Sequence, residues 1–342
     1  NDFEAEARCR RHMIRFAADL GDDAAVLDRI QTALKRCDEM GQPKHAFAFY
    51  DALSDYHLDR GDLVGAQEAL ETAAFLMKVH QLSDQAGRIS HKRGRFHEDQ
   101  GKLTEARLCY EQSLTAYIEM GNLRGQSIIL GCLANIHRIQ GRYEEATTHY
   151  EAALRIHKDW GNPISAAMVQ GNMGNLFKEL GKLEEAQRLY SESGAAFRAL
   201  GRKQNEAISL GNQGELLIKM GRIAEARQVL ERSVALCSEL AFKAEGAFLT
   251  YLARVERAES RLEKAGEVLK RGERLLRSSG QRYHLGVLLS ERGQWALEMG
   301  DLGDARQALA DAQKIATDLE ANPRSELGSA VGHLRKALEA MT

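Results

Sequence analysis

The chain has 342 residues, of which 44% are hydrophobic, 6% are aromatic and 28% are charged. Its formal net charge of −2 at pH 7 argues against a general binder of polyanions. No apolar run reaches the roughly eighteen residues that a membrane-spanning helix needs, so we expect no membrane partner.

Glycine returns at a fixed interval along most of the chain. Gly181 and Gly221 are forty residues apart, and each is followed five residues later by an alanine, Ala186 or Ala226. The same glycine position is held by Gly21, Gly61, Gly101, Gly141 and Gly300, with Ser260 replacing glycine once. A fixed period of this length indicates tandem repeats, each packing only on its neighbours.

Two apolar stripes with helical spacing and two short turns make up each period. Pro43 and Pro163 fall where a first helix begins, a position that needs no N–H group. No segment alternates with period two, so we predict no strands. Turns this short force consecutive helices into antiparallel hairpins. We predict one solenoid over residues 1–342, with hairpins over 4–40, 44–80, 84–120, 124–160, 164–200, 204–240, 244–279 and 283–320 and a capping helix over 325–340.

The five cysteines form no Cys-x-x-Cys pair. Cys37 and Cys237 share one position in the repeat, where other repeats carry large side chains, so we expect both to be buried free thiols. Free thiols indicate a reducing, cytoplasmic setting. The chain begins at Asn1 without a methionine, which indicates a piece of a longer protein.

The fifth repeat, residues 164–200, shows the full residue pattern of one repeat. It has a small residue midway along the first helix (Gly174), an apolar residue opening the second (Leu183), then Ala186 and the large Tyr190. A small residue lets the two helices approach, and the large one fills the space between them. This pattern resembles the tetratricopeptide repeat family over residues 44–320, and more weakly over 4–40.

The repeat of forty residues is longer than the usual thirty-four of that family. It resembles the long-repeat type found in kinesin light chains, GoLoco-binding polarity adaptors, bacterial peptide-pheromone receptors and the sensor arms of STAND-type regulators. The resemblance implies an all-α, right-handed superhelical solenoid of about eight hairpins plus a C-terminal capping helix. It also implies that the first helices of the hairpins line a concave groove.

Asparagines form rows on the predicted first helices. An asparagine offers a donor and an acceptor on a short, stiff side chain, which suits it to bind a peptide backbone. The alternative is that these side chains bond one another or only solvate the surface. Arg88, Lys92 and Arg95 share one helix face and could bind acidic groups together with Arg138. Their alternative is to pair with aspartates on neighbouring turns. The predicted partner-binding residues of the groove are Arg88, Lys92, Arg95, Asn135, Arg138, Asn172, Asn175, Lys178, Asn212 and Glu215.

The sequence contains no phosphate-binding loop, no His-Glu-x-x-His motif and no nucleophile elbow, so we predict no enzyme and no cofactor. His57, His97 and His137 share one repeat position, but repeat spacing puts them too far apart to share a metal ion. We expect core histidines there and no metal site. The basic residues are local and have no interleaved aromatics, so we predict no nucleic-acid partner.

Taken together, these features predict a non-catalytic scaffold that recognises a protein or peptide segment, with acidic groups, in its concave groove. Two alternatives stay open. One is a sensor or regulatory arm of a larger signalling or transcription-regulating protein. The other is an assembly scaffold that associates with itself, and the oligomeric state is left open.

Overall fold

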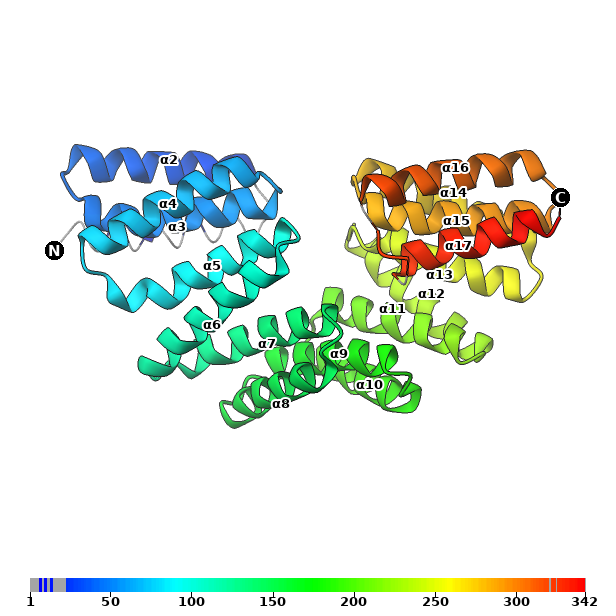
Figure 1. Cartoon of the computed structure of the whole chain (residues 1–342), viewed down its shortest axis with the longest axis horizontal. Helices are drawn as coiled ribbons and strands as arrows, with labels where there is room; N and C mark the ends of the chain where they lie inside the picture. Colours follow the sequence, from blue (N-terminus) through cyan, green and yellow to red (C-terminus); the bar gives the residue numbers. More distant parts are fainter. Residues whose placement is uncertain are drawn as a thin grey trace. The chain divides into compact units, whose positions relative to one another are not determined.

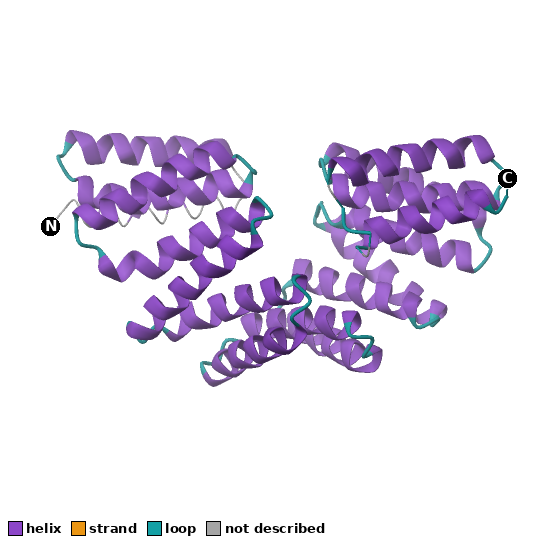
Figure 2. Ribbon diagram, viewed as in Figure 1, coloured by secondary structure: helices purple, strands orange, loops and turns teal. Residues whose placement is uncertain are grey.

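The computed structural model describes residues 23–319, 321–323 and 325–341, together with six residues nearer the N-terminus, Glu6, Ala7, Cys9, Arg10, Met13 and Ile14. Every regular element in this part of the chain is a helix, and none is a strand (Figures 1 and 2). This confirms the all-α prediction. The first helix of the predicted hairpin 4–40 lies largely outside the described residues.

Seven helix hairpins follow one another in the described residues. We call the members of each pair the first and the second helix. The pairs are α3 (Pro43–Asp59) with α4 (Leu63–Val79), α5 (Ala86–Asp99) with α6 (Leu103–Glu119), α7 (Leu123–Ile139) with α8 (Tyr143–Asp159), α9 (Pro163–Glu179) with α10 (Leu183–Ala199), α11 (Lys203–Lys219) with α12 (Ile223–Glu239), α13 (Glu245–Ala258) with α14 (Leu262–Ser278), and α15 (Arg282–Glu298) with α16 (Leu302–Asp318). Helix α2 (Asp23–Glu39) precedes them, a short 3-10 helix η1 (Ser83–Gln85) precedes α5, and α17 (Glu326–Glu339) follows them.

The turn after α9 shows why glycine recurs at this position. Gly181 has a φ of 74°, a left-handed conformation in which glycine has no steric penalty. This lets the amide of Lys182 donate to the carbonyl of Phe177 at 2.9 Å, and that of Gly181 to Lys178 at 3.2 Å. These two bonds satisfy carbonyls that the helix end would otherwise leave without donors.

In several hairpins a glycine midway along the first helix brings the two helices close together. A Cβ atom on Gly174 would lie 2.7 Å from the ring of Tyr190, and one on Gly214 would lie 2.4 Å from Leu230. These contacts are the ones that the repeat pattern predicts. The last hairpin differs, because a Cβ on Gly293 would meet Leu334 of α17, at 2.3 Å. The capping helix therefore supplies the large side chain there.

The chain divides into two compact units, residues 1–161 and 162–342, which we describe separately. In the first unit α3 contacts α5, and in the second α9 contacts α11, α11 contacts α13 and α13 contacts α15. Among the described residues, no two second helices contact one another to this extent. We call the side of each unit on which first helices meet its inner face.

Helix α17 completes the core of the second unit. It packs against α15 and α16 and buries Leu327, Val331, Leu334 and Leu338.

Elsewhere in the core, Cys37 and Cys237 are free and buried, which confirms the prediction of buried free thiols. Within the described part of the chain, no helix is both long and apolar enough to cross a membrane.

Candidate partner-binding surface

Asn175 lies on α9 and is held by a tyrosine of the second helix. The hydroxyl group of Tyr190 donates a hydrogen bond to Asn175 Oδ1 at 2.6 Å. In the first unit, Tyr150 donates in the same way to Oδ1 of Asn135. Because the oxygen of each amide is occupied, its NH₂ group is the part left to donate to a ligand.

Asn172 and Asn212 hold equivalent positions on the contacting helices α9 and α11. Both side chains are half-buried, and neither makes a hydrogen bond within the described residues. Asn172 lies three residues before Asn175, so the two share one face of α9. We call Asn172, Asn175 and Asn212 the asparagine row.

An ion pair shows where this row lies in the second unit. Lys178 of α9 donates to Oε2 of Glu215 on α11 at 2.6 Å, and their side chains are 17% and 23% exposed. Glu215 occupies the same repeat position as Asn175, forty residues later. The pair bridges two first helices, which places this row of the repeat on the inner face.

The predicted basic cluster of the first unit is paired with aspartates of α3. Lys92 is 7% exposed and its ammonium group lies 2.7 Å from Oδ1 of Asp51 and 2.8 Å from Oδ2 of Asp55. Burial raises the pKa of Asp55, and the charge of Lys92 opposes that shift. Arg88 lies 3.3 Å from the carboxylate of Asp51.

Arg95 completes this cluster by pairing with Asp59 at 2.5 Å. The pairing with aspartates, one of the two alternatives that the sequence left open, therefore exists in the structure. Recognition of acidic partner groups by Arg88, Lys92 and Arg95 stays a prediction. Arg138 is half-buried on α7.

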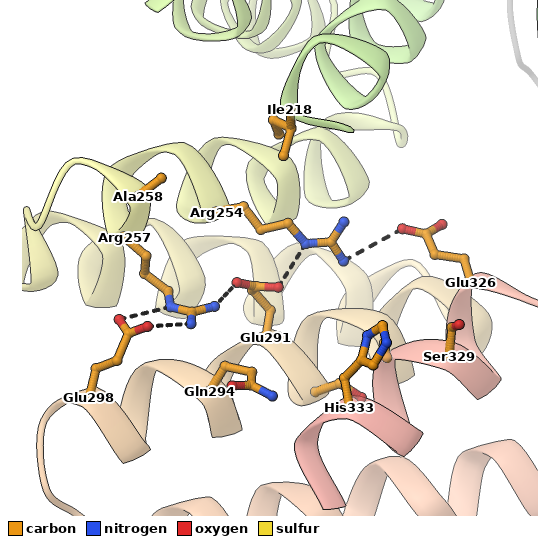
Figure 3. Close-up of a pocket in the computed structure, with 12 residues that line it drawn as sticks. Ile218, Arg254, Arg257, Ala258, Glu291, Gln294, Glu298, Glu326, Ser329 and His333 are labelled. Carbon is orange, nitrogen blue, oxygen red and sulfur yellow. Dashed lines mark hydrogen bonds and ion pairs between the residues drawn. The ribbon is translucent and has the colours of Figure 1, made fainter. Parts of the chain in front are cut away.

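A pocket of about 540 Å³ opens on the inner face of the second unit (Figure 3). We call it the C-terminal pocket. Helices α13, α15 and α17 form most of its wall, and α11 contributes one residue. Its lining residues are Ile218, Arg254, Arg257, Ala258, Ser290, Glu291, Gln294, Glu298, Glu326, Ser329, Ala330 and His333.

Two arginines of α13 bind two glutamates of α15 inside this pocket. Arg254 Nε donates to Oε2 of Glu291 at 2.7 Å. Arg257 binds the other oxygen of Glu291, and it also donates from Nε and from a terminal nitrogen to Glu298, at 3.1 and 2.5 Å. The glutamates raise the pKa of both arginines, against the effect of burial.

Glu326 of α17 is the third carboxylate of the pocket and has weaker partners. Its Oε2 accepts a hydrogen bond from the hydroxyl of Tyr251 at 3.1 Å. Its Oε1 lies 3.7 Å from a terminal nitrogen of Arg254, is inaccessible to solvent and accepts no hydrogen bond from the described residues. Burial, followed by the negative charge of Glu215, raises the pKa of Glu326.

The pocket escaped prediction because α17 carries no repeat pattern. Periodicity places Arg254, Arg257 and Gln294 in the same rows as the predicted residues, although they are not among the predicted partner-binding residues. Nothing in the sequence indicates that Glu326 and His333 return to the inner face beside them.

The histidines in register have different neighbours in the structure. His57 Nδ1 lies 2.7 Å from a carboxylate oxygen of Asp62, and the buried His137 stacks on His149 with ring centroids 5.2 Å apart. Across the described residues, no three histidine, cysteine or acidic side chains lie close enough to hold a metal ion.

The tandem hairpins and their Gly–Tyr contacts define an all-helical repeat protein of the solenoid class. The model of the tetratricopeptide repeat family matches residues 85–159, 125–193 and 164–239, so the repeats over residues 85–239 are tetratricopeptide repeats. The match confirms the resemblance noted in the sequence over these residues. No curated protein is matched by the sequence of the whole chain.

Several solved structures share this fold at low sequence identity. A Rap protein complexed with Competence and Sporulation Factor has a TM-score of 0.63 and 13% identity, covering 98% of this chain and 97% of that one. A STAND protein with a tetratricopeptide repeat sensor from Pyrococcus horikoshii has a TM-score of 0.64 and 13% identity, covering 83% of this chain and 44% of that one. BtubC (BKLC) from P. vanneervenii has a TM-score of 0.55 and 22% identity, covering 65% of this chain and 92% of that one.

Proposed function

We propose that this protein is a non-catalytic scaffold that binds a segment of a partner protein along the inner faces of its units. Binding uses the asparagine row to hold the backbone of the segment. Charged side chains beside the row, Lys178 and Glu215 in the second unit, add selectivity.

The free amide groups of the asparagine row carry this proposal. Asparagine is a poorer helix former than alanine or leucine, so its presence on a regular helix costs stability. Asn172 and Asn212 recover none of that cost through hydrogen bonds within the described residues, although both are half-buried. A peptide backbone offers the N–H and C=O groups that these amides can bind.

The structural relatives support the class of function. The Rap protein of similar fold was solved as a complex with Competence and Sporulation Factor. In a repeat solenoid each unit exposes a long inner surface, and a change of a few side chains on it is enough to accept another partner. The side chains of this surface, and not the fold, therefore determine which partner is bound.

A peptide selected against the protein from a display library provides the test. We expect the triple variant Asn172→Ala, Asn175→Ala, Asn212→Ala to bind it at least about tenfold more weakly, because each lost hydrogen bond costs about 0.5–1.5 kcal/mol. The control is Gln228→Ala, which changes an exposed amide on the second helix α12. Equal binding by the wild type and the triple variant would exclude the asparagine row.

A second candidate function is a sensor arm of a larger signalling protein. It is favoured by the similarity to the STAND protein, whose sensor consists of tetratricopeptide repeats and of which this chain spans 44%. In that role, the same inner faces would bind the signal. The sequence of the full-length gene decides between the two, because a sensor arm requires an effector domain in the same polypeptide.

A further inference from the structure

We propose that the C-terminal pocket binds a basic side chain, lysine or arginine, of the partner segment, with its charged end at Glu326. This inference rests on the proposed function, since it assigns one specificity position on the same inner face. It is carried by the cavity, by the ion pairs that already occupy its arginines, and by the unbonded oxygen of Glu326.

Most charges of the C-terminal pocket are already neutralised by one another. All three guanidinium nitrogens of Arg257 bind Glu291 or Glu298, so Arg257 has no nitrogen left without a carboxylate partner. Both oxygens of Glu291 are likewise bound, one by Arg254 and one by Arg257. These four side chains neutralise one another and offer little to a ligand, although Arg254 also lies 3.7 Å from Glu326.

Glu326 is the third carboxylate of the pocket, and Arg254 pairs with it only at long range. Its Oε1 accepts no hydrogen bond from the described residues and is 3.7 Å from Arg254, too far for a direct hydrogen bond. A buried acceptor without a donor is costly. Oε1 is inaccessible to solvent while the Glu326 side chain as a whole is 29% exposed, so the carboxylate has to rotate to bring this oxygen to a donor of the ligand. An ammonium or guanidinium group supplies a donor together with a compensating charge.

The net charge of the pocket lining favours a positively charged ligand. The lining contains three glutamates, Glu291, Glu298 and Glu326, and two arginines, which leaves one formal negative charge. An acidic ligand would meet Arg254 but would also approach three carboxylates. A basic ligand finds the excess charge in its favour.

The rest of the pocket wall also suits a long basic side chain. Ile218, Ala258 and Ala330 give the wall an apolar part against which the aliphatic stem of a lysine or arginine can pack. Ser329, His333 and Gln294 also line the pocket and have no side-chain hydrogen-bond partners in the described part of the chain. Figure 3 shows Ser329 and His333 on the same helix as Glu326, across from the arginines. They are additional acceptors for a group with several N–H donors.

A random peptide display library, selected in parallel against three full-length proteins, tests this inference. The proteins are wild type, Glu326→Gln and the control Glu339→Gln, which removes the same charge at the exposed far end of α17. We expect lysine or arginine to be enriched at one peptide position by wild type and Glu339→Gln, and not by Glu326→Gln. Glu326→Gln should keep its melting temperature or raise it, because it removes a poorly compensated buried charge.

One selected peptide is then measured against its analogue with norleucine in place of lysine. We expect the norleucine peptide and the Glu326→Gln variant each to weaken binding about tenfold, and the two changes together to cost no more than one alone. Additive losses, or basic enrichment that survives in Glu326→Gln, would overturn the inference. So would selected peptides without an enriched basic position, which would leave the proposed function intact. Failure to select any peptide would overturn both.

Discussion

The hydroxyl group of Tyr190 donates to Oδ1 of Asn175 at 2.6 Å, and this bond joins the core of the repeat to its inner face. Tyr190 is fully buried between α9 and α10, where its ring packs on Gly174. Its hydroxyl end reaches the half-buried Asn175 and fixes the direction of that amide. A core side chain thus orients a surface group for binding, which reduces the entropy lost when a ligand is bound.

Gly174→Ala should destabilise the protein because of this packing. The added Cβ would lie 2.7 Å from the Tyr190 ring, which is fully buried and cannot move aside freely. We expect the free energy of unfolding to fall by about 1–2 kcal/mol, the overpacking cost less the gain in helix propensity. Urea denaturation followed by circular dichroism measures it. The control is Gly131→Ala in α7, where a Cβ would meet no atom within 4 Å. That variant should be about 0.5–1 kcal/mol more stable, and equal effects of the two would contradict the packing argument.

Ala241→Gly should stabilise the turn after α12. Ala241 has a φ of 47° at a position where most repeats have glycine. A left-handed conformation costs a non-glycine residue about 1–2 kcal/mol, and the greater chain entropy of glycine offsets part of that gain. We expect the free energy of unfolding to rise by about 0.5–1 kcal/mol. Gly181→Ala should lower it by about 1 kcal/mol, since nothing lies within 4 Å of its added Cβ and only the backbone is strained. A destabilised Ala241→Gly variant would show that the left-handed residue carries no strain.

Lys92→Met should be one of the most damaging single changes in the first unit. It leaves the carboxylates of Asp51 and Asp55 without their buried cation, a loss of about 3–5 kcal/mol. Adding Asp51→Asn and Asp55→Asn should recover most of this loss, because the uncompensated charges are then removed. Thermal melts of the single and triple variants measure the recovery. If the triple variant is no more stable than Lys92→Met, charge compensation is not the role of Lys92.

His91 should make the stability of the first unit depend on pH. Burial, with smaller effects of Lys92 and Arg95, lowers the pKa of His91 to about 4, against 6.5 for an unperturbed histidine. Between these values the unfolded chain binds a proton that the folded protein does not, so stability falls as the pH falls from about 6.5 to about 4. Other histidines contribute as well, so the comparison is with His91→Gln. We expect the wild type to lose on the order of 2 kcal/mol more than the variant across this range. Parallel pH profiles of the two proteins would contradict the assignment.

The parts of the fold that repeat could be predicted from the sequence. The contact of Gly174 with Tyr190 and the left-handed turn at Gly181 depend on residues within one period. The same residue pattern recurs in other repeats, so the sequence indicates these features more than once. The division into two compact units neither confirms nor contradicts the prediction of one solenoid over residues 1–342. A pattern within one repeat carries no information about how successive repeats pack against one another.

The candidate site was harder to predict, because it depends on contacts outside the period. Lys92 lies on α5 and Asp51 on α3. The sequence alone could not decide whether such charged side chains pair with one another or stay unpaired and bind a ligand. That choice depends on side-chain distances of a few ångströms. Glu326 meets Tyr251 across seventy-five residues, a contact that no repeat spacing indicates.

The central claim is that Asn175 presents its NH₂ group to a partner backbone because Tyr190 occupies its oxygen. Asn175→Asp tests it most directly, since aspartate keeps the shape and the acceptor for Tyr190, replaces the donor by a second acceptor and adds a negative charge. The measurement is the calorimetric affinity of a peptide selected against the wild type. We expect affinity to fall about tenfold or more, through loss of a hydrogen bond and repulsion between the new charge and the peptide carbonyl, with the melting temperature little changed. Unchanged affinity in the folded variant would contradict the claim.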